Sequence, residues 1–227
     1  MSVPRYFALI PAAGIGERMG GDGPKQYVSL AGKPMLQHVL ETFAGAPQIA
    51  HTFVVVSADD GYIAQVPLSQ RTTVLRCGGA TRRASVTNGL AAIAAEVCAD
   101  DWILVHDAAR PGVTVALIDQ LIAAVKDDPV GGLLAVPVVD TIKRSDAGGR
   151  AGMTVERASL WAAQTPQMFR YAQLQNALQQ AGEVTDEASA IEALGLRPLL
   201  VEGSARNFKV TLPQDRLLAE LYLKGSA

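Results

Sequence analysis

Apolar runs of strand length alternate with segments of helical periodicity through most of this chain. The predicted strands are Tyr6–Pro11, Thr52–Ser57, Thr73–Arg76, Trp102–His106, Leu133–Val138 and Pro198–Glu202, and the predicted helices are Pro34–Phe43, Thr81–Val97 and Val115–Lys126. Thr81 and Thr114 are the expected N-caps of the second and third of these helices. This alternation predicts an α/β fold, a mostly parallel sheet with helices on both faces. The 227 residues suffice for a single domain of that kind. Because ligands bind such sheets beyond the carboxyl ends of the strands, functional residues are expected there.

The charge balance argues against two classes of partner. With 20 Lys and Arg against 22 Asp and Glu, the formal net charge is −2, which favours binding neither to nucleic acid nor to a membrane surface. No uncharged apolar stretch approaches the ~20 residues of a membrane span, and the run Tyr6–Ile10 is too short for a signal peptide. Cys77 and Cys98 lack metal-ligand spacing and are expected to be buried in a reducing compartment. These features predict a soluble, cytoplasmic protein.

The first predicted strand runs into a turn of small residues that suits a polyphosphate. Ala12, Ala13 and Gly14 follow the strand, and the cations Arg18 and Lys25 come after them. Small residues let backbone N–H groups approach phosphate oxygens, and the cations neutralise the remaining charge. The chain has no Gly-Lys-Ser/Thr triplet here and no third glycine of the dinucleotide fingerprint, so neither of those motifs applies. The alternative is an ordinary tight turn between strand and helix.

A second candidate lies at the end of the predicted strand Trp102–His106. Asp107 follows it and could hold Mg²⁺, which prefers one or two carboxylates together with phosphates and water. Alternatively, Asp107 caps the next turn or pairs with Arg110. His106 is expected to be a partly buried imidazole with satisfied hydrogen bonds. Since the sequence shows no Ser-His-Asp or Cys-His arrangement, the chemistry should depend on cations and a metal rather than on a protein nucleophile.

Two further segments carry candidate ligand contacts. Gly79, Arg82 and Ser85 belong to a second glycine turn that opens a helix and offers backbone groups to a nucleobase. Arg82 could instead be only a solvated charge. Lys209 is placed in an apolar strand before a C-terminal helix, where a buried ammonium requires an anion. The alternative for Lys209 is an edge-strand side chain whose charge reaches the solvent.

The segment 138–160 departs from the alternation of strands and helices. Two stretches of alternating character flank the turn cluster Ser145–Gly149, which predicts a β-hairpin. A two-stranded hairpin is marginal in water by itself, so this arm must lie against another surface. We expect it to be exchanged between the subunits of a symmetric homodimer. The alternative is an arm that folds back on its own sheet.

Taken together, seven motifs resemble those of the 2-C-methyl-D-erythritol 4-phosphate cytidylyltransferases of the non-mevalonate isoprenoid pathway. The motifs are Pro11-Ala-Ala-Gly-x-Gly-x-Arg-Met19, Pro24-Lys25-Gln26, His106-Asp-Ala-Ala-Arg-Pro111, Asp140-Thr-x-Lys-Arg144, Thr165-Pro-Gln167, Thr185-Asp-Glu-Ala188 and Asn207-x-Lys-Val-Thr211. They span nearly the whole chain. The resemblance implies a Rossmann-like nucleotidyltransferase domain and a homodimer with interlocking arms.

The resemblance also implies a reaction and a set of site residues. CTP and methylerythritol phosphate would join with release of pyrophosphate, and the substrate phosphate, already an anion, would attack the α-phosphorus without a general base. Positioning and charge stabilisation then carry the catalysis. The implied catalytic residues are Arg18, Lys25 and Lys209, the nucleotide-binding residues Ala12, Ala13, Gly14, Gly79, Arg82 and Ser85, the acceptor-binding residues Thr141, Arg157 and Arg110, and the Mg²⁺ ligand Asp107, with Thr141 and Arg157 supplied by the partner's arm.

Two other functions are consistent with parts of this pattern. A cytidylyltransferase for another polyol phosphate, such as ribitol 5-phosphate, would share the phosphate-binding half. A non-catalytic nucleotide-binding regulator would keep the fold but would not require Arg18, Lys25, Asp107 and Lys209 together. The glycine-rich segment 20–24 is predicted to be a lid that becomes ordered when CTP binds.

Overall fold

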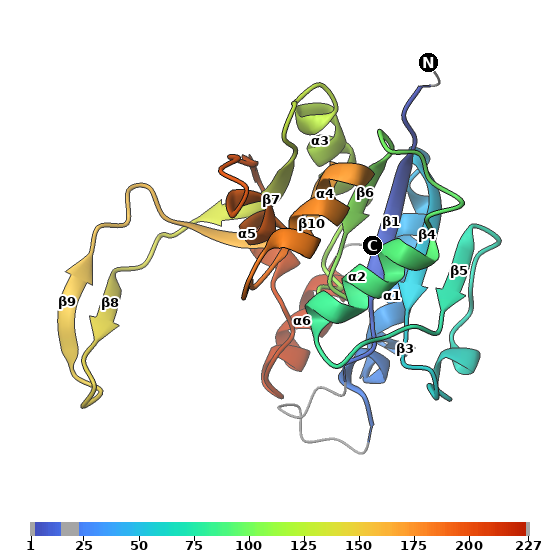
Figure 1. The fold of residues 1–227 in the computed structure, drawn as a ribbon. Coiled ribbons are helices and arrows are strands. Elements are labelled where there is room, and N and C mark those ends of the chain that lie inside the picture. Colours follow the sequence, from blue (N-terminus) through green and yellow to red (C-terminus); the bar gives the residue numbers. More distant parts are fainter. Residues whose placement is uncertain (1–2, 15–22, 226–227) are drawn as a thin grey trace.

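The described residues of this computed structural model, 3–14 and 23–225, form a seven-stranded sheet with the order β11-β7-β10-β6-β1-β4-β5 (Figure 1). All neighbours are parallel except β10, which is antiparallel to β6 and β7, so the mostly parallel sheet is confirmed. The strands of this sheet are β1 Tyr6–Pro11, β4 Ile49–Val55, β5 Thr72–Leu75, β6 Trp102–Val105, β7 Gly132–Pro137, β10 Trp161–Arg170 and β11 Leu199–Glu202.

Helices cover both faces of the sheet, as predicted. Helices α1 and α3 pack on one face, where their buried leucine, isoleucine and valine side chains join one core cluster with those of β1 and β4. Helices α2, α4 and α5 pack on the other face and form a second cluster. The helices are α1 Met35–Gly45, α2 Arg82–Ala92, α3 Val115–Val125, α4 Tyr171–Gln180, α5 Glu187–Glu192 and α6 Asp215–Lys224. The fold thus needs two cores, one on each face of the sheet.

Threonine side chains cap helices α2 and α3, at the two residues expected from the sequence. The Thr81 hydroxyl accepts from the backbone N–H of Ala84 at 3.0 Å, and the Thr114 hydroxyl accepts from that of Leu117 at 3.3 Å. Such caps satisfy backbone donors that the helix leaves without partners. The cap at Thr81 places Arg82 at the first position of α2, next to the carboxyl edge of the sheet.

The longest strand, β10, is missing from the prediction. Its segment contains Pro166, three uncharged polar residues and Arg170, a composition that argues against a central strand. The structure nevertheless buries Gln164, Thr165 and Gln167, because each has hydrogen-bond partners in neighbouring segments. Tertiary partners therefore override the local pattern here.

Two further predictions are wrong. Lys209 is not in a strand: the structure has no strand over 208–211, although the Val210 backbone N–H donates to Ala109 O at 2.8 Å. The cysteines are not both buried, since Cys77 is half-buried and Cys98 is exposed. A short apolar run does not distinguish a strand from a packed loop, and it does not show which of its side chains face the solvent.

The arm, residues 138–160, extends away from the rest of the fold (Figure 1). Strands β8 Ile142–Ser145 and β9 Ala151–Val155 pair antiparallel in a sheet of their own. No side chain of the arm is buried. Val139 and Met153 are exposed apolar side chains of the arm, and Trp161, the first residue of β10 at the base of the arm, is partly exposed. The arm therefore presents apolar surface without covering it within its own chain.

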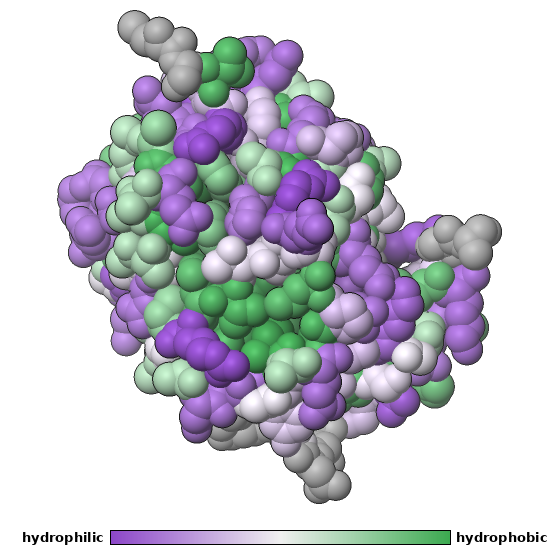
Figure 2. All heavy atoms as spheres, turned by 90° about the vertical axis from the view of Figure 1, so that its right-hand side faces the viewer, coloured by the Kyte–Doolittle hydropathy of each residue, from purple (hydrophilic) through white to green (hydrophobic). Residues whose placement is uncertain are grey.

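Other apolar surface lies at one end of the main sheet and on the C-terminal helix. Figure 2 looks at the molecule from the β5 side and shows hydrophobic residues gathered in a patch with hydrophilic residues around it. On α6, Leu217 and Leu221 are 70% and 68% exposed. Among the residues that the structure describes, no helix is long and apolar enough to cross a membrane.

Candidate active site

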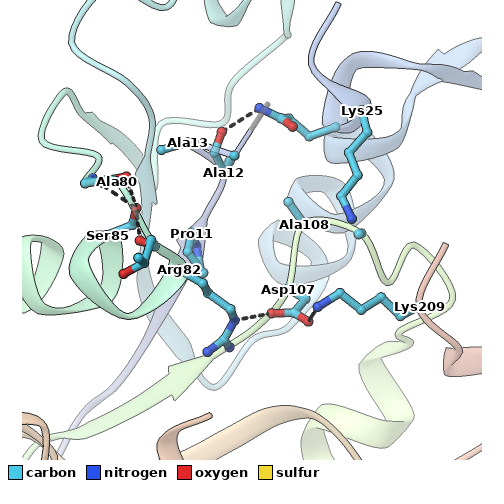
Figure 3. A pocket seen from close by; sticks show the side chains of 15 residues that line it. Pro11, Ala12, Ala13, Lys25, Ala80, Arg82, Ser85, Asp107, Ala108 and Lys209 are labelled. Atoms are coloured by element: carbon cyan, nitrogen blue, oxygen red, sulfur yellow. Dashed lines mark hydrogen bonds and ion pairs between the residues drawn. The ribbon is translucent and has the colours of Figure 1, made fainter. Parts of the chain in front are cut away.

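A cavity of about 370 Å³ opens at the carboxyl edge of the sheet, beyond β1 and β6 (Figure 3). Most of the residues selected from the sequence line it. They are Ala12, Ala13, Gly14, Lys25, Gly79, Arg82, Ser85, Asp107 and Lys209. Figure 3 shows Lys25 reaching into the cavity from one side and Ser85 standing on the opposite side, with Asp107 between Arg82 and Lys209. Arg18 and most of the expected lid lie in 15–22, outside the described residues.

The turn after β1 is held in shape by side chains that the sequence reasoning had not assigned. Gln26, which is buried, donates its amide N–H to Ala12 O at 2.6 Å, and Ser57 donates its hydroxyl to Ala13 O at 3.1 Å. Gln26 belongs to the motif Pro24-Lys25-Gln26, so the sequence contained a signal that could have assigned it to the site. Its amide ties the segment that carries Lys25 to the turn, which positions the lysine over the cavity.

The second glycine turn lies against the first. A Cβ atom added to Gly78 would stand 2.3 Å from Ala13 Cβ, and one added to Gly79 would stand 2.5 Å from Ala84 Cβ. Only glycine permits this approach. Ser85 holds the turn in place, because its hydroxyl oxygen accepts from the Gly79 N–H at 3.1 Å and donates to Thr81 O at 3.0 Å. The two turns thus form one wall of the cavity with exposed backbone.

Asp107 is the electrostatic centre of the site. Its Oδ1 accepts from Arg82 Nε at 2.6 Å, and its Oδ2 accepts from Lys209 Nζ at 2.8 Å. Burial alone would raise the pKa of this carboxyl, but the charges of Arg82 and Lys209 outweigh burial and hold the pKa well below its usual range. Asp107 is therefore an anion at neutral pH. Of the alternatives raised above, an ion pair does form, but at short range it is with Arg82 and Lys209, whereas Arg110 Nε is 3.9 Å away.

Arg82 is not a solvated charge. Its Nη1 and Nη2 donate to the two carboxylate oxygens of Glu187 at 2.7 and 2.9 Å, in addition to the contact from Nε to Asp107. Glu187 is 1% exposed. Sequence reasoning missed this glutamate, although it stands inside the quoted motif Thr185-Asp-Glu-Ala188. The pairing joins residues 105 positions apart, so only the tertiary structure could show it.

His106 lies beneath Asp107 and is fully buried, so the expectation of partial burial is wrong. Its Nε2 lies 3.1 Å from Arg110 O and its Nδ1 2.9 Å from Thr165 Oγ1. The carbonyl only accepts, so Nε2 carries the proton and Nδ1 accepts from the Thr165 hydroxyl. That hydroxyl oxygen accepts in turn from the Asp107 N–H at 3.0 Å. The chain of bonds holds the backbone of Asp107 in place.

This burial predicts an acid-sensitive contribution to stability. Burial lowers the pKa of His106 from 6.5 to about 4. Between these pH values the unfolded chain binds a proton on His106 that the folded chain does not. The contribution of His106 to the free energy of unfolding is therefore fully present above pH 6.5 and decreases as the pH falls toward 4. We expect His106→Asn to cost less free energy of unfolding at pH 5 than at pH 8, by about 2 kcal/mol. Urea unfolding at both pH values measures this, and an equal cost at both would contradict it.

A smaller cavity of about 170 Å³ adjoins the first and shares Arg82, Asp107 and Lys209 with it. Arg110 also lines this cavity, but its Nη1 and Nη2 donate to the backbone oxygens of Asn207 and Ala163 at 2.8 and 3.2 Å. Burial lowers the pKa of the Arg110 guanidinium. Two of the three nitrogens of the Arg110 guanidinium therefore already donate to backbone oxygens of the protein.

Thr141 and Arg157 do not lie in either cavity. Both are exposed on the arm, and Arg157 donates to Val139 O within that arm. Within one chain, the structure thus brings together the cations, Asp107 and the two turns but leaves these two residues apart from them.

The donor set around Asp107 fits a magnesium ion that arrives with phosphates. Within 3–14 and 23–225, no group of three or more His, Cys, Asp or Glu could hold a metal ion by itself. Asp107 offers one ionised carboxylate facing the cavity, and its Oδ2 is paired with Lys209, whose side chain is 38% exposed. One carboxylate completed by phosphate oxygens and water is a usual set for Mg²⁺.

A turn of small residues at the carboxyl edge of a mostly parallel sheet, with several cations around one carboxylate, is typical of α/β proteins that act on nucleotides, and here it indicates an α/β nucleotidyltransferase. Comparison with known proteins agrees with this class. The chain belongs to the 2-C-methyl-D-erythritol 4-phosphate cytidylyltransferase family, whose model matches residues 6–225.

Individual relatives are similar over nearly their whole length. The 2-C-methyl-D-erythritol 4-phosphate cytidylyltransferase of Nitrosospira multiformis is 57% identical over 228 residues, which cover 97% of this chain and 98% of the relative. That of Dechloromonas aromatica is 50% identical over 226 residues, which cover 98% and 99%. A crystal structure of a 4-diphosphocytidyl-2C-methyl-D-erythritol synthase is 42% identical, with a TM-score of 0.86 and coverage of 97% and 98%.

Proposed function

We propose that this protein transfers a cytidylyl group from CTP to 2-C-methyl-D-erythritol 4-phosphate. The products are 4-diphosphocytidyl-2-C-methyl-D-erythritol, a precursor in isoprenoid biosynthesis, and pyrophosphate. Family membership supports this assignment. The observation that carries it in the structure is that two cavities meet at Asp107, Arg82 and Lys209. Such a pair of cavities gives the nucleotide and the acceptor one place each, with the charged residues between them.

The larger cavity is assigned to CTP. The backbone of Ala12, Ala13 and Gly14 would face the nucleotide, and Gly79 with the helix start at Arg82 would face the cytosine or ribose. Ser85 supports the nucleotide indirectly, because its hydroxyl holds Gly79. We assign the triphosphate to Lys25 and, outside the described residues, to Arg18.

The smaller cavity, with Arg110 on its wall, is assigned to the acceptor phosphate. A phosphate there lies next to Lys209, which also borders the nucleotide cavity, so one ammonium can attract both reacting groups. The acceptor phosphate is an anion and attacks the α-phosphorus in line, without transferring a proton to the protein. Catalysis then consists of alignment and of stabilising the charge that develops on the α-phosphate oxygens.

Mg²⁺ completes the proposed site. Asp107 would hold the ion together with phosphate oxygens, and the positive charge of the ion would help the pyrophosphate to leave. The protein's own part is to keep Asp107 ionised and aimed at the boundary between the cavities, which Arg82, Lys209 and Thr165 do in the free chain.

We further propose a cytoplasmic homodimer in which each arm completes the site of its partner. Two observations support the exchange: the arm has no buried side chain of its own, and it carries Thr141 and Arg157 away from the cavities. Both residues would then hold the acceptor phosphate from the partner's side, where the paired N–H groups of a guanidinium suit a phosphate.

The test is pyrophosphate release with CTP and Mg²⁺, in parallel assays with methylerythritol 4-phosphate and with ribitol 5-phosphate. We expect turnover with the first and none with the second. Turnover with ribitol 5-phosphate alone would keep the chemistry but change the acceptor. Binding of CTP without turnover of either acceptor would favour a nucleotide-binding regulator.

A further inference from the structure

The motif Thr185-Asp-Glu-Ala188 contributes a buried anion that the proposed reaction does not use directly. Glu187 is 1% exposed and is the first residue of α5. Its carboxylate does not line either of the two cavities of the site. Both of its oxygens accept from Arg82, which does line them. A buried carboxylate in that position calls for a role other than contact with substrate.

Glu187 is itself rigidly held. The Asp186 carboxylate caps the helix by accepting from the Ser189 N–H at 2.9 Å, and the Ser189 hydroxyl accepts from the Asp186 N–H at 3.1 Å. Gln167 of β10 donates to Asp186 Oδ2 at 2.8 Å and accepts from the Ala188 N–H at 2.8 Å. These contacts tie the first turn of α5 to the central sheet, so Glu187 is a fixed anchor.

Arg82 lies where helix energetics alone would not place a cation. It is the first residue of α2, where the positive end of the helix dipole disfavours a guanidinium. Buried ion pairs are also weak evidence for stability, because desolvation offsets most of the attraction. The pairing of Arg82 with Glu187 is therefore better explained by orientation than by stabilisation.

The geometry limits how Arg82 can bind Asp107. Because Nη1 and Nη2 face Glu187, only Nε reaches Asp107, and it takes Oδ1 alone at 2.6 Å. Asp107 Oδ2 then remains for Lys209. Released from Glu187, the guanidinium could turn and pair with both oxygens of Asp107, as arginine does with carboxylates elsewhere. That arrangement would compete with Lys209 and with any cation for Oδ2.

We propose that Glu187 is a positioning residue. By accepting from both Nη atoms of Arg82, it restricts Arg82 to Oδ1 of Asp107 and leaves Oδ2 for Lys209 or another cation of the site. The inference rests on the proposed function for its kinetic consequence, but not for its structural one. The test variant is Glu187→Gln, which keeps the size of the side chain while replacing one acceptor oxygen by an NH₂ group. The matched control is Glu192→Gln on the exposed last residue of α5.

The kinetic test is a double-mutant cycle. We expect Glu187→Gln to lower kcat about tenfold to a hundredfold, the usual range for a residue that orients a residue of the site without touching the substrate. KM for CTP should change by less than about threefold. In an Arg82→Lys background, which keeps the charge but lacks the fork, Glu187→Gln should have little further effect. Glu192→Gln should behave as wild type. Additive effects of the two substitutions, or an unchanged kcat in folded Glu187→Gln, would overturn the proposal.

A crystal structure of the substrate-free Glu187→Gln protein separates this inference from the proposed function. We expect Arg82 to contact both oxygens of Asp107 in that variant. If Arg82 keeps its contact to Oδ1 alone, the positioning role is wrong, whatever the assay shows. If the wild-type protein releases no pyrophosphate while Arg82 turns as expected, the fault lies with the proposed function, and the role of Glu187 in orienting Arg82 stands.

Discussion

Lys25→Ala should lower kcat by roughly 10²–10³, the range for losing one preorganised group that stabilises developing charge. Lys25 reaches into the cavity toward the cluster around Asp107, on the side where the triphosphate is assigned (Figure 3). The side chain is only half-buried, so its loss should leave the free energy of unfolding nearly unchanged. Steady-state pyrophosphate release and urea unfolding of the same preparation measure both quantities.

Lys33→Ala is the matched control for this prediction. Lys33 follows Lys25 in the sequence, and its side chain is 46% exposed, pairs with Glu41 at 2.8 Å and does not line the cavity. Its replacement should leave kcat as in wild type, because Lys33 does not line the cavity. It should also change the free energy of unfolding little, because exposed ion pairs contribute little to stability. A Lys25→Ala enzyme that retains a third or more of the wild-type kcat would remove Lys25 from the mechanism.

The second large effect is the recovery of activity by mixing two inactive variants. Arg157→Ala should impair the use of methylerythritol phosphate while CTP still binds, because Arg157 lies on the arm and Lys25 on the main body. If arms are exchanged, a heterodimer of Lys25→Ala and Arg157→Ala contains one site with both wild-type residues. At equal mixing, about a quarter of all sites should then be intact.

Two controls make the mixing experiment decisive. Arg150→Ala, at the exposed turn of the same arm, should retain activity by itself. Subunit exchange is verified by purifying heterodimers through differently tagged chains, and the assay is then performed on that fraction. Purified heterodimers without activity would show that each site is built from one chain, and the arm would then need a different role.

Much of the fold could be predicted because its signals are local. Strand β1 has the predicted bounds, and Thr81 and Thr114 cap their helices as expected, since apolar periodicity and capping depend on neighbours in sequence. Strand β10 escaped detection because its polar residues are stabilised by distant partners. Lys209 was assigned to a strand that is absent, since a short apolar run does not distinguish a strand from a packed loop.

The candidate site divides in the same way. The amino-acid sequence by itself determined which residues are available: two turns of small residues, the cations Lys25 and Lys209, and Asp107 at a strand end. Only the tertiary structure decided which of these charged residues pair with one another and which polar residues are buried around them. It paired Arg82 with Glu187 across 105 positions and buried His106 beneath Asp107. The physical reason is that turn and strand propensities act between neighbouring residues, whereas charge pairing and burial depend on which segments the fold brings together.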